Sequence, residues 1–150
     1  MKLANRVAWS VSLTLTLAVL TGCQGLGPRA TGQRDGVFVH VSRDGQDAHA
    51  VLMGLKMASL MAADHDVLVY FDLKGVNVVL QNAPEITHPE FEPARAQLQA
   101  LLNKGVPLYA CPSCLKAAGK QPGDLLPGVK PAEKAAFFGF TQGRILTLDY

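Results

Sequence analysis

The sequence lacks the marks of several large classes of protein. Charged residues make up only 17% of its 150 positions against 49% hydrophobic ones, which excludes the composition of a disordered chain. After Trp9, its only tryptophan, there is no run of 18 or more apolar residues, which excludes a polytopic membrane protein. Length and composition therefore predict one compact globular domain.

The sequence also has little net charge. Its formal charge is +2, but Lys2 and Arg6 precede residue 22 and no acidic residue does, so the chain from Cys23 onward holds 12 basic and 12 acidic residues. Nucleic-acid-binding domains carry a basic excess, which this part of the chain lacks. The sequence pI of 8.5 is therefore due to the leader, and a nucleic-acid partner is not expected.

Motifs for nucleotides and metals are absent as well. The segment QPGDLLPGVKP does not follow the G-x-x-x-x-G-K-[ST] spacing of a phosphate-binding loop, so no cofactor is expected. The histidines are scattered, with no two at ligand spacing: His40, His49, His65 and His88. The acidic residues near the expected strand ends are typical of turn formers and caps: Asp64, Asp66 and Asp72.

Residues 1–22 are expected to form a secretory signal peptide. A short basic start precedes 14 mostly apolar residues, 7–20, which are too few and too rich in serine and threonine for a membrane-spanning helix. The sequence LTGC at 20–23 resembles the lipobox of bacterial lipoproteins, in which the cysteine receives a diacylglycerol and becomes the first residue after cleavage. The alternative is an ordinary cleavage site with an incidental cysteine.

Lipidation of Cys23 anchors a protein without a membrane-spanning helix, because several acyl chains bind a bilayer stably where one chain binds only marginally. Gln24 follows the cysteine in place of an aspartate. In the Gram-negative lipoprotein pattern this implies sorting to the outer membrane, facing the periplasm. Residues 23–35 are rich in glycine and polar groups and are expected to be a flexible tether, so the folded domain is expected over 36–150.

The folded part alternates between strand-like and helix-like hydrophobic patterns. Buried strands are predicted at 37–41, 67–71, 106–110 and 145–148, with a further extended run at 76–80. Helices are predicted at 45–63, 94–103, 112–119 and 131–138, and a proline-rich loop at 82–93. This alternation predicts a three-layer α/β domain with a mostly parallel sheet and helices on both faces.

The first long helix is expected to be apolar on nearly all sides, with Asp44 as its N-cap. Its core stripe is predicted to be Ala48, Leu52, Leu55, Ser59 and Ala62. Met53 and Leu60 fall on another face, which a monomer leaves exposed. We therefore expect a homo-oligomer that packs through this helix, unless the proline-rich loop covers that face.

Two cysteines carry the clearest chemical signal. Apart from Cys23, the thiols are Cys111 and Cys114, spaced C-x-x-C after a predicted parallel strand, where open α/β sheets place their sites. With Cys111 as N-cap, Pro112 takes the first helical position and the Cys114 N–H points at the Cys111 sulfur, which favours a thiolate. Cys111 is thus the predicted nucleophile and Cys114 the thiol that resolves a mixed disulfide or persulfide.

Three other interpretations of the thiol pair are open. A static disulfide fits an oxidising compartment, although so small a ring constrains little of the unfolded chain. A structural zinc site needs four ligands, and no second C-x-x-C or adjacent histidine pair supplies the remaining two. A soft metal such as Cu(I) requires no ligands beyond the thiolates of Cys111 and Cys114.

Three stretches of the sequence resemble the DsrE/DsrF-like proteins of sulfur relay and sulfur oxidation. They are VFVHVSRDGQDAHAVLMGLKMA, VLVYFDLKGVNVVL and, above all, NKGVPLYACPSCLKAAG. The family places its acceptor cysteine directly after a strand with a glycine eight residues later, and Cys111 and Gly119 match this pattern. The C-terminal ILTLDY resembles the closing strand of the family, so the likeness covers roughly residues 36–150.

The resemblance implies a three-layer α/β fold, oligomers packed through helices, and a cysteine that carries sulfur as a persulfide. Members that relay sulfur are cytoplasmic, whereas this chain has an export signal, and not every member has the second cysteine. Two classes of function stay open. One is a membrane-anchored persulfide carrier or sulfurtransferase that works with a sulfur donor or acceptor protein. The other is a lipoprotein binding module whose C-x-x-C is a passive disulfide or a copper site.

Overall fold

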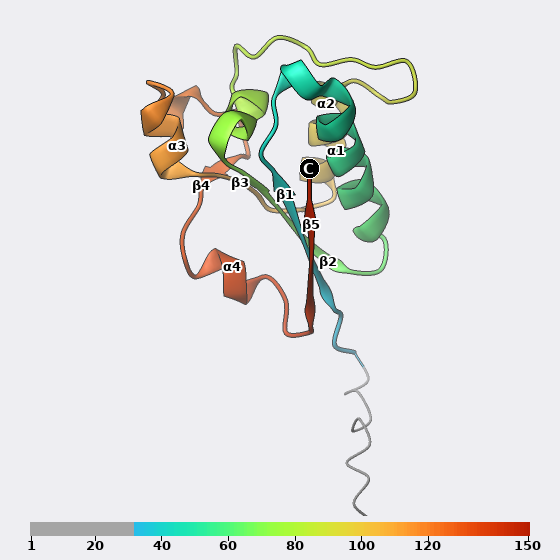
Figure 1. Ribbon diagram of the computed structural model, residues 1–150. Coiled ribbons are helices and arrows are strands. Elements are labelled where there is room, and N and C mark those ends of the chain that lie inside the picture. Colours follow the sequence, from blue (N-terminus) through green and yellow to red (C-terminus); the bar gives the residue numbers. More distant parts are fainter. Residues whose placement is uncertain (1–31) are drawn as a thin grey trace, which may run out of the picture.

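The sheet of this protein is parallel throughout. The structure, a computed structural model, describes residues 32–150 and places five strands in the order β4-β3-β2-β1-β5 (Figure 1). Their bounds are Gly36–Val41 for β1, Asp66–Phe71 for β2, Leu108–Ala110 for β3, Lys130–Pro131 for β4 and Ile145–Asp149 for β5. Every neighbouring pair runs parallel, which confirms the predicted sheet.

Helices cover the sheet on both sides. The α-helices are α1 at Ala48–Met61, α2 at Ala94–Asn103, α3 at Pro112–Ala117 and α4 at Ala136–Gly139. Short 3₁₀ helices are η1 at Gly45–Asp47, η2 at Leu73–Val79 and η3 at Pro122–Asp124. Figure 1 shows α1 and α2 together on one side of the sheet and the short α4 on the other. The three-layer α/β architecture predicted from the sequence is confirmed.

The two faces of the sheet differ in how well they are covered. Val39 on β1 lies in register with Val69 on β2, which is in register with Leu108 on β3, and all three are buried. They form one core with Leu52 of α1 and Leu98 of α2. Since side chains alternate along a strand, the intervening residues point to the opposite face, where α4 gives only partial cover.

Two predicted elements took another form. The run 76–80 was expected to be extended, but residues 73–79 form the 3₁₀ helix η2. In the sheet β2 is paired with β3 on one side and with β1 on the other, so neither edge of β2 is free for residues 76–80 to join. The helix expected at 131–138 is shorter, because Lys130 and Pro131 pair with the free edge of β3 before α4 begins at Ala136.

Helix α1 begins later and buries a slightly different stripe than expected. Asp44 caps the 3₁₀ turn η1, and Asp47 caps α1 by accepting a hydrogen bond from Ala50 N–H. The buried residues are Val51, Leu52, Gly54, Leu55 and Ala58. The predicted stripe members Ala48, Ser59 and Ala62 are only partly buried, because the stripe follows the 3.6-residue period from Val51.

Exposed apolar side chains lie in several places in the described region. Leu60 on α1 is 54% exposed, as expected for the face predicted to meet another copy, and Met53 is partly buried. Phe138 on α4 and both Ile145 and Leu146 on the edge strand β5 are also exposed. The homo-oligomer stays a prediction.

The end of the expected tether contacts the domain. Arg34 donates hydrogen bonds to the carbonyls of Asp64 and His65, and Asp35 binds Arg144. The expected signal peptide, Cys23 and the tether as far as residue 31 lie outside the described residues. Within residues 32–150, no helix has both the length and the apolar character needed to cross a membrane.

The crossing of η2 over the end of β1 should depend on Gly75. A Cβ added there would lie 2.0 Å from the carbonyl oxygen of Val41, which is backbone and cannot move aside alone. Gly75→Ala is therefore expected to lower the free energy of unfolding by about 1–3 kcal/mol in a urea titration. The control is Gly123→Ala, where an added Cβ meets nothing within 4 Å and a change within about 0.5 kcal/mol is expected. Equal stability of the two variants would contradict the packing argument.

Candidate functional site

Four polar side chains of the sheet lie in one row near its carboxyl end. Asp149 on β5, His40 on β1, Tyr70 on β2 and Tyr109 on β3 are consecutive register partners across four strands. Because partners in register point to the same face, these side chains share the lightly covered side of the sheet. Cys111 directly follows β3 at the same end. Parallel α/β sheets place their sites at this edge.

The local geometry of Cys111 is the one predicted from the sequence. It is the N-cap of α3, Pro112 occupies the first turn, and the N–H of Cys114 donates to the Cys111 Sγ at 3.3 Å. The Cys111 N–H donates to Phe71 O at 2.8 Å, which ties it to the end of β2. Both cysteines are partly exposed free thiols. The spacing C-P-x-C thus places both sulfur atoms at one helix end.

The surroundings of Cys111 favour its thiolate. Burial by itself raises the pKa of Cys111, but hydrogen bonds from the Cys114 thiol, the Tyr70 phenol and backbone N–H groups outweigh burial and lower it. Burial and the adjacent Cys111 both raise the pKa of Tyr70, so this phenol stays protonated and acts as a donor. Tyr70 is a site residue that the sequence analysis missed.

The pKa of the Cys114 thiol is shifted upward, in the opposite direction to that of Cys111. Burial raises its pKa, and the adjacent Cys111 and Asp72 raise it further against the opposing effect of a hydrogen bond from Leu73 N–H. That N–H lies 3.1 Å from the Cys114 Sγ. Leu73 has a φ of 44°, an uncommon backbone conformation for a residue with a Cβ. Of the two thiols, Cys111 therefore loses its proton first, and Cys114 keeps its proton to higher pH.

His40 links the edge strand to the turn that follows β2. Its Nε2 lies 2.7 Å from Asp72 Oδ1 and its Nδ1 lies 2.7 Å from Asp149 Oδ1. Burial lowers the pKa of His40, but the hydrogen bonds and charges of these two carboxylates outweigh burial and raise it above 6.5. The His40 ring also stacks on Tyr70, with centroids 5.9 Å apart. His40, one of the scattered histidines of the sequence, is therefore part of the site, as is Asp72, expected to be a turn former.

The other histidines and acids lie elsewhere. His65 pairs with Asp64 at 2.6 Å, and Asp66 lies 3.7 Å from Arg34, all near the amino ends of β1 and β2. His49 and His88, which share no ligand spacing in the sequence, stack with ring centroids 5.0 Å apart. Among residues 32–150 no group of three or more histidine, cysteine, aspartate or glutamate side chains could hold a metal ion.

Comparison with known proteins agrees with this fold. The sequence model of the DsrE/DsrF-like family matches residues 36–144. The YchN protein from E. coli has a similar structure, with 17% identity and a TM-score of 0.58 over 77% of this chain and 99% of its own. The protein MTH1491 from Methanobacterium thermoautotrophicum, described as of unknown function, has 23% identity and a TM-score of 0.57 over the same shares. No curated protein matches the chain.

The hydrogen bond from Tyr70 can be tested through the pH dependence of alkylation. Only the thiolate reacts, so alkylation of Cys111 increases as the pH rises through its pKa. Tyr70→Phe removes a donor to the charged form and should move this midpoint upward by about one pKa unit. The measurement is the iodoacetamide rate at Cys111, read by peptide mass at each pH.

Tyr109→Phe is the matched control for this substitution. Tyr109 is the register partner of Tyr70 on β3. In the part of the chain that the structure describes, its hydroxyl makes no contact with the sulfur atom of Cys111 or Cys114. Its loss should leave the midpoint unchanged. A midpoint that moves equally in both variants, or in neither, contradicts a specific role for the Tyr70 phenol.

Proposed function

The chain belongs to the DsrE/DsrF-like family, and on that premise we propose that it carries sulfane sulfur as a persulfide on Cys111, with Cys114 as the resolving thiol. The family is in general related to sulfur relay, in which its members work with partner proteins. The partner of this chain is then a sulfur donor or acceptor protein.

The observation that carries this proposal is the position of Cys111. Its sulfur accepts the N–H of Cys114 at the first turn of α3, and the Tyr70 phenol donates to it as well. Donors aimed at one sulfur stabilise a thiolate, and the thiolate is the form that attacks sulfur.

Loading and release then follow as two exchange steps. The Cys111 thiolate attacks the outer sulfur of a sulfane donor, an S–S bond forms as the donor's S–S bond breaks, and the donor leaves as a thiolate with the electron pair. An acceptor thiolate can take the outer sulfur, so that Cys111 leaves as a thiolate. Alternatively the Cys114 thiol attacks the Cys111 Sγ, which forms a disulfide and releases hydrosulfide with the thiol's proton.

The proposed place of action is a membrane surface outside the cytoplasm. The support is the leader with its LTGC sequence at 20–23 and the glutamine that follows, which is the pattern of an outer-membrane lipoprotein facing the periplasm. A lipid on Cys23 leaves residues 24–32 as the connection to the domain, and the first hydrogen bonds of the described residues to the domain are made by Gln33, Arg34 and Asp35.

Persulfide formation is expected to separate the two cysteines. Exposure of the purified protein to polysulfide should add the mass of one sulfur atom to Cys111. Cys111→Ser should abolish this addition, whereas Cys114→Ser should let the persulfide accumulate because its resolving thiol is gone. Intact-mass and peptide-mass measurements give the site. The carrier function is contradicted if neither thiol reacts faster than a free cysteine, and the binding-module interpretation then gains support.

Lipidation of Cys23 predicts a specific mass. Protein extracted from membranes should begin at residue 23 and carry acyl chains on that cysteine, because the lipid is attached before cleavage. Cys23→Ala should leave an unprocessed precursor or move the protein to the soluble fraction. Cys114→Ala is a control that should leave the anchor intact. Cleavage at another residue, or an unmodified amino terminus, would rule out the anchor.

A further inference from the structure

A pocket of about 690 Å³ lies beside Cys114, and Cys111 is not among the residues that line it. It is lined by residues that follow β1, by the start of η2 and by the second half of α3, and Cys114 forms part of its wall. The side chain of Leu73, which is 65% exposed, lies at the same pocket. A volume of this size is typical of small-molecule sites, so the pocket can admit a compound that reacts with a thiol.

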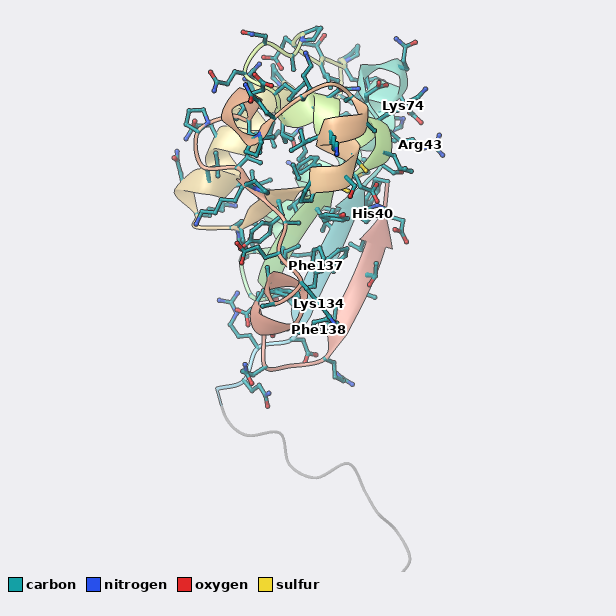
Figure 2. The ribbon with its side chains drawn as sticks, turned by 90° about the vertical axis from the view of Figure 1, so that its left-hand side faces the viewer. His40, Arg43, Lys74, Lys134, Phe137 and Phe138 are labelled. Atoms are coloured by element: carbon teal, nitrogen blue, oxygen red, sulfur yellow. The ribbon has the colours of Figure 1, made fainter. Side chains whose placement is uncertain are left out.

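The pocket is cationic. Among the described residues that line it, Arg43 and Lys74 carry charge and no carboxylate is present. Neither cation belongs to an ion pair within residues 32–150. Figure 2 shows Arg43 and Lys74 close together beyond His40, at the carboxyl end of the strands. Asp72, which precedes Leu73, is hydrogen-bonded to His40 and does not line the pocket.

The fold itself brings these two cations together. Gly75 lets η2 cross so close to the end of β1 that an added Cβ would lie 2.0 Å from Val41 O and 3.4 Å from Arg43 O. Lys74, the preceding residue, is thereby fixed beside Arg43. The Cys114 wall of the pocket is neutral, because burial and the adjacent Cys111 raise the pKa of this thiol. An anion in the pocket therefore meets a neutral thiol at this wall and not a thiolate.

We propose that this pocket binds a small anionic sulfane-sulfur donor of the thiosulfate type and that Arg43 and Lys74 hold its oxyanion, an inference that rests on the proposed function of Cys111. The Cys114 and Cys111 side chains hydrogen-bond each other, so a donor against Cys114 lies next to the thiolate. The Cys111 thiolate attacks the sulfane sulfur, the S–S bond of thiosulfate breaks, and sulfite leaves with the electron pair. The two cations stabilise the charge on the departing sulfite.

The test compares two donors on the purified full chain. Thiosulfate has an oxyanion for the cations to hold, whereas polysulfide has none. The variant Arg43→Gln with Lys74→Gln is expected to raise the thiosulfate concentration that half-saturates Cys111 persulfide formation by about tenfold or more. Its loading from polysulfide, an anion without oxygen atoms to accept hydrogen bonds, should fall by less than about threefold. Release of one sulfite for each persulfide formed would confirm that the S–S bond of thiosulfate breaks in this step.

Lys116→Gln is the matched control, because Lys116 lies on α3 but does not line the pocket, so its loss should leave both donors unaffected. A second readout is thiosulfate binding by calorimetry to Cys111→Ser, which cannot react. This binding should be measurable and should weaken about tenfold or more when Arg43 and Lys74 are also replaced.

The outcomes separate this inference from the function on which it rests. If polysulfide loads Cys111 but thiosulfate does not, the carrier function stands and the pocket inference is overturned. It is also overturned if the double variant loses both donors equally, because the cations then act on the thiolate and not on an oxyanion. If neither donor loads Cys111, the carrier function fails, and thiosulfate binding measured by calorimetry then decides on the pocket. Binding that depends on Arg43 and Lys74 supports an anion site there, and the absence of binding overturns it.

Discussion

The close crossing of residues 72–75 over the end of β1 is the constraint on which the site depends. Gly75 donates its N–H to Asp72 O at 2.6 Å, and its missing side chain leaves room for the Val41 carbonyl. This tight turn forces Leu73 into a left-handed conformation that costs on the order of 1 kcal/mol. In return its N–H points at the Cys114 Sγ. One turn thereby connects β1, β2 and α3.

The charge state of the thiol pair follows from an unequal division of donors between two adjacent sulfur atoms. Burial opposes ionisation at both cysteines. The Cys111 sulfur accepts hydrogen bonds from the Tyr70 phenol, the Cys114 thiol and two backbone N–H groups. The Cys114 sulfur accepts one from the N–H of Leu73 and lies near the negative charge of Asp72. Two adjacent thiolates repel each other, so the two cysteines do not ionise together readily. The first negative charge forms on Cys111, where the hydrogen-bond donors are more numerous.

The sequence was sufficient for the parts of this arrangement that are local. The cap of α3 depends on four consecutive residues, so the positions of Cys111 and Cys114 could be predicted from C-P-x-C alone. The role of Tyr70 could not, because it depends on strand register, which brings Tyr70 opposite His40 only after β1 and β2 pair. The turn at η2 was missed for a related reason: its apolar residues match a strand pattern, and only the sheet order shows that β2 has a strand on both sides.

The thin cover on one face of the sheet serves the chemistry of the site. The Tyr70 ring is held between neighbours on that face, with His40 stacked at 5.9 Å and Phe137 edge-on at 5.0 Å. Figure 2 shows Phe137, which belongs to the short α4, on the same side of the sheet as His40. Aromatic contacts of this kind fix the plane of a ring and hence the direction of its hydroxyl group. A thicker layer would bury Cys111 further and raise its pKa, whereas the present cover orients Tyr70 and leaves the thiolate within reach of its partners.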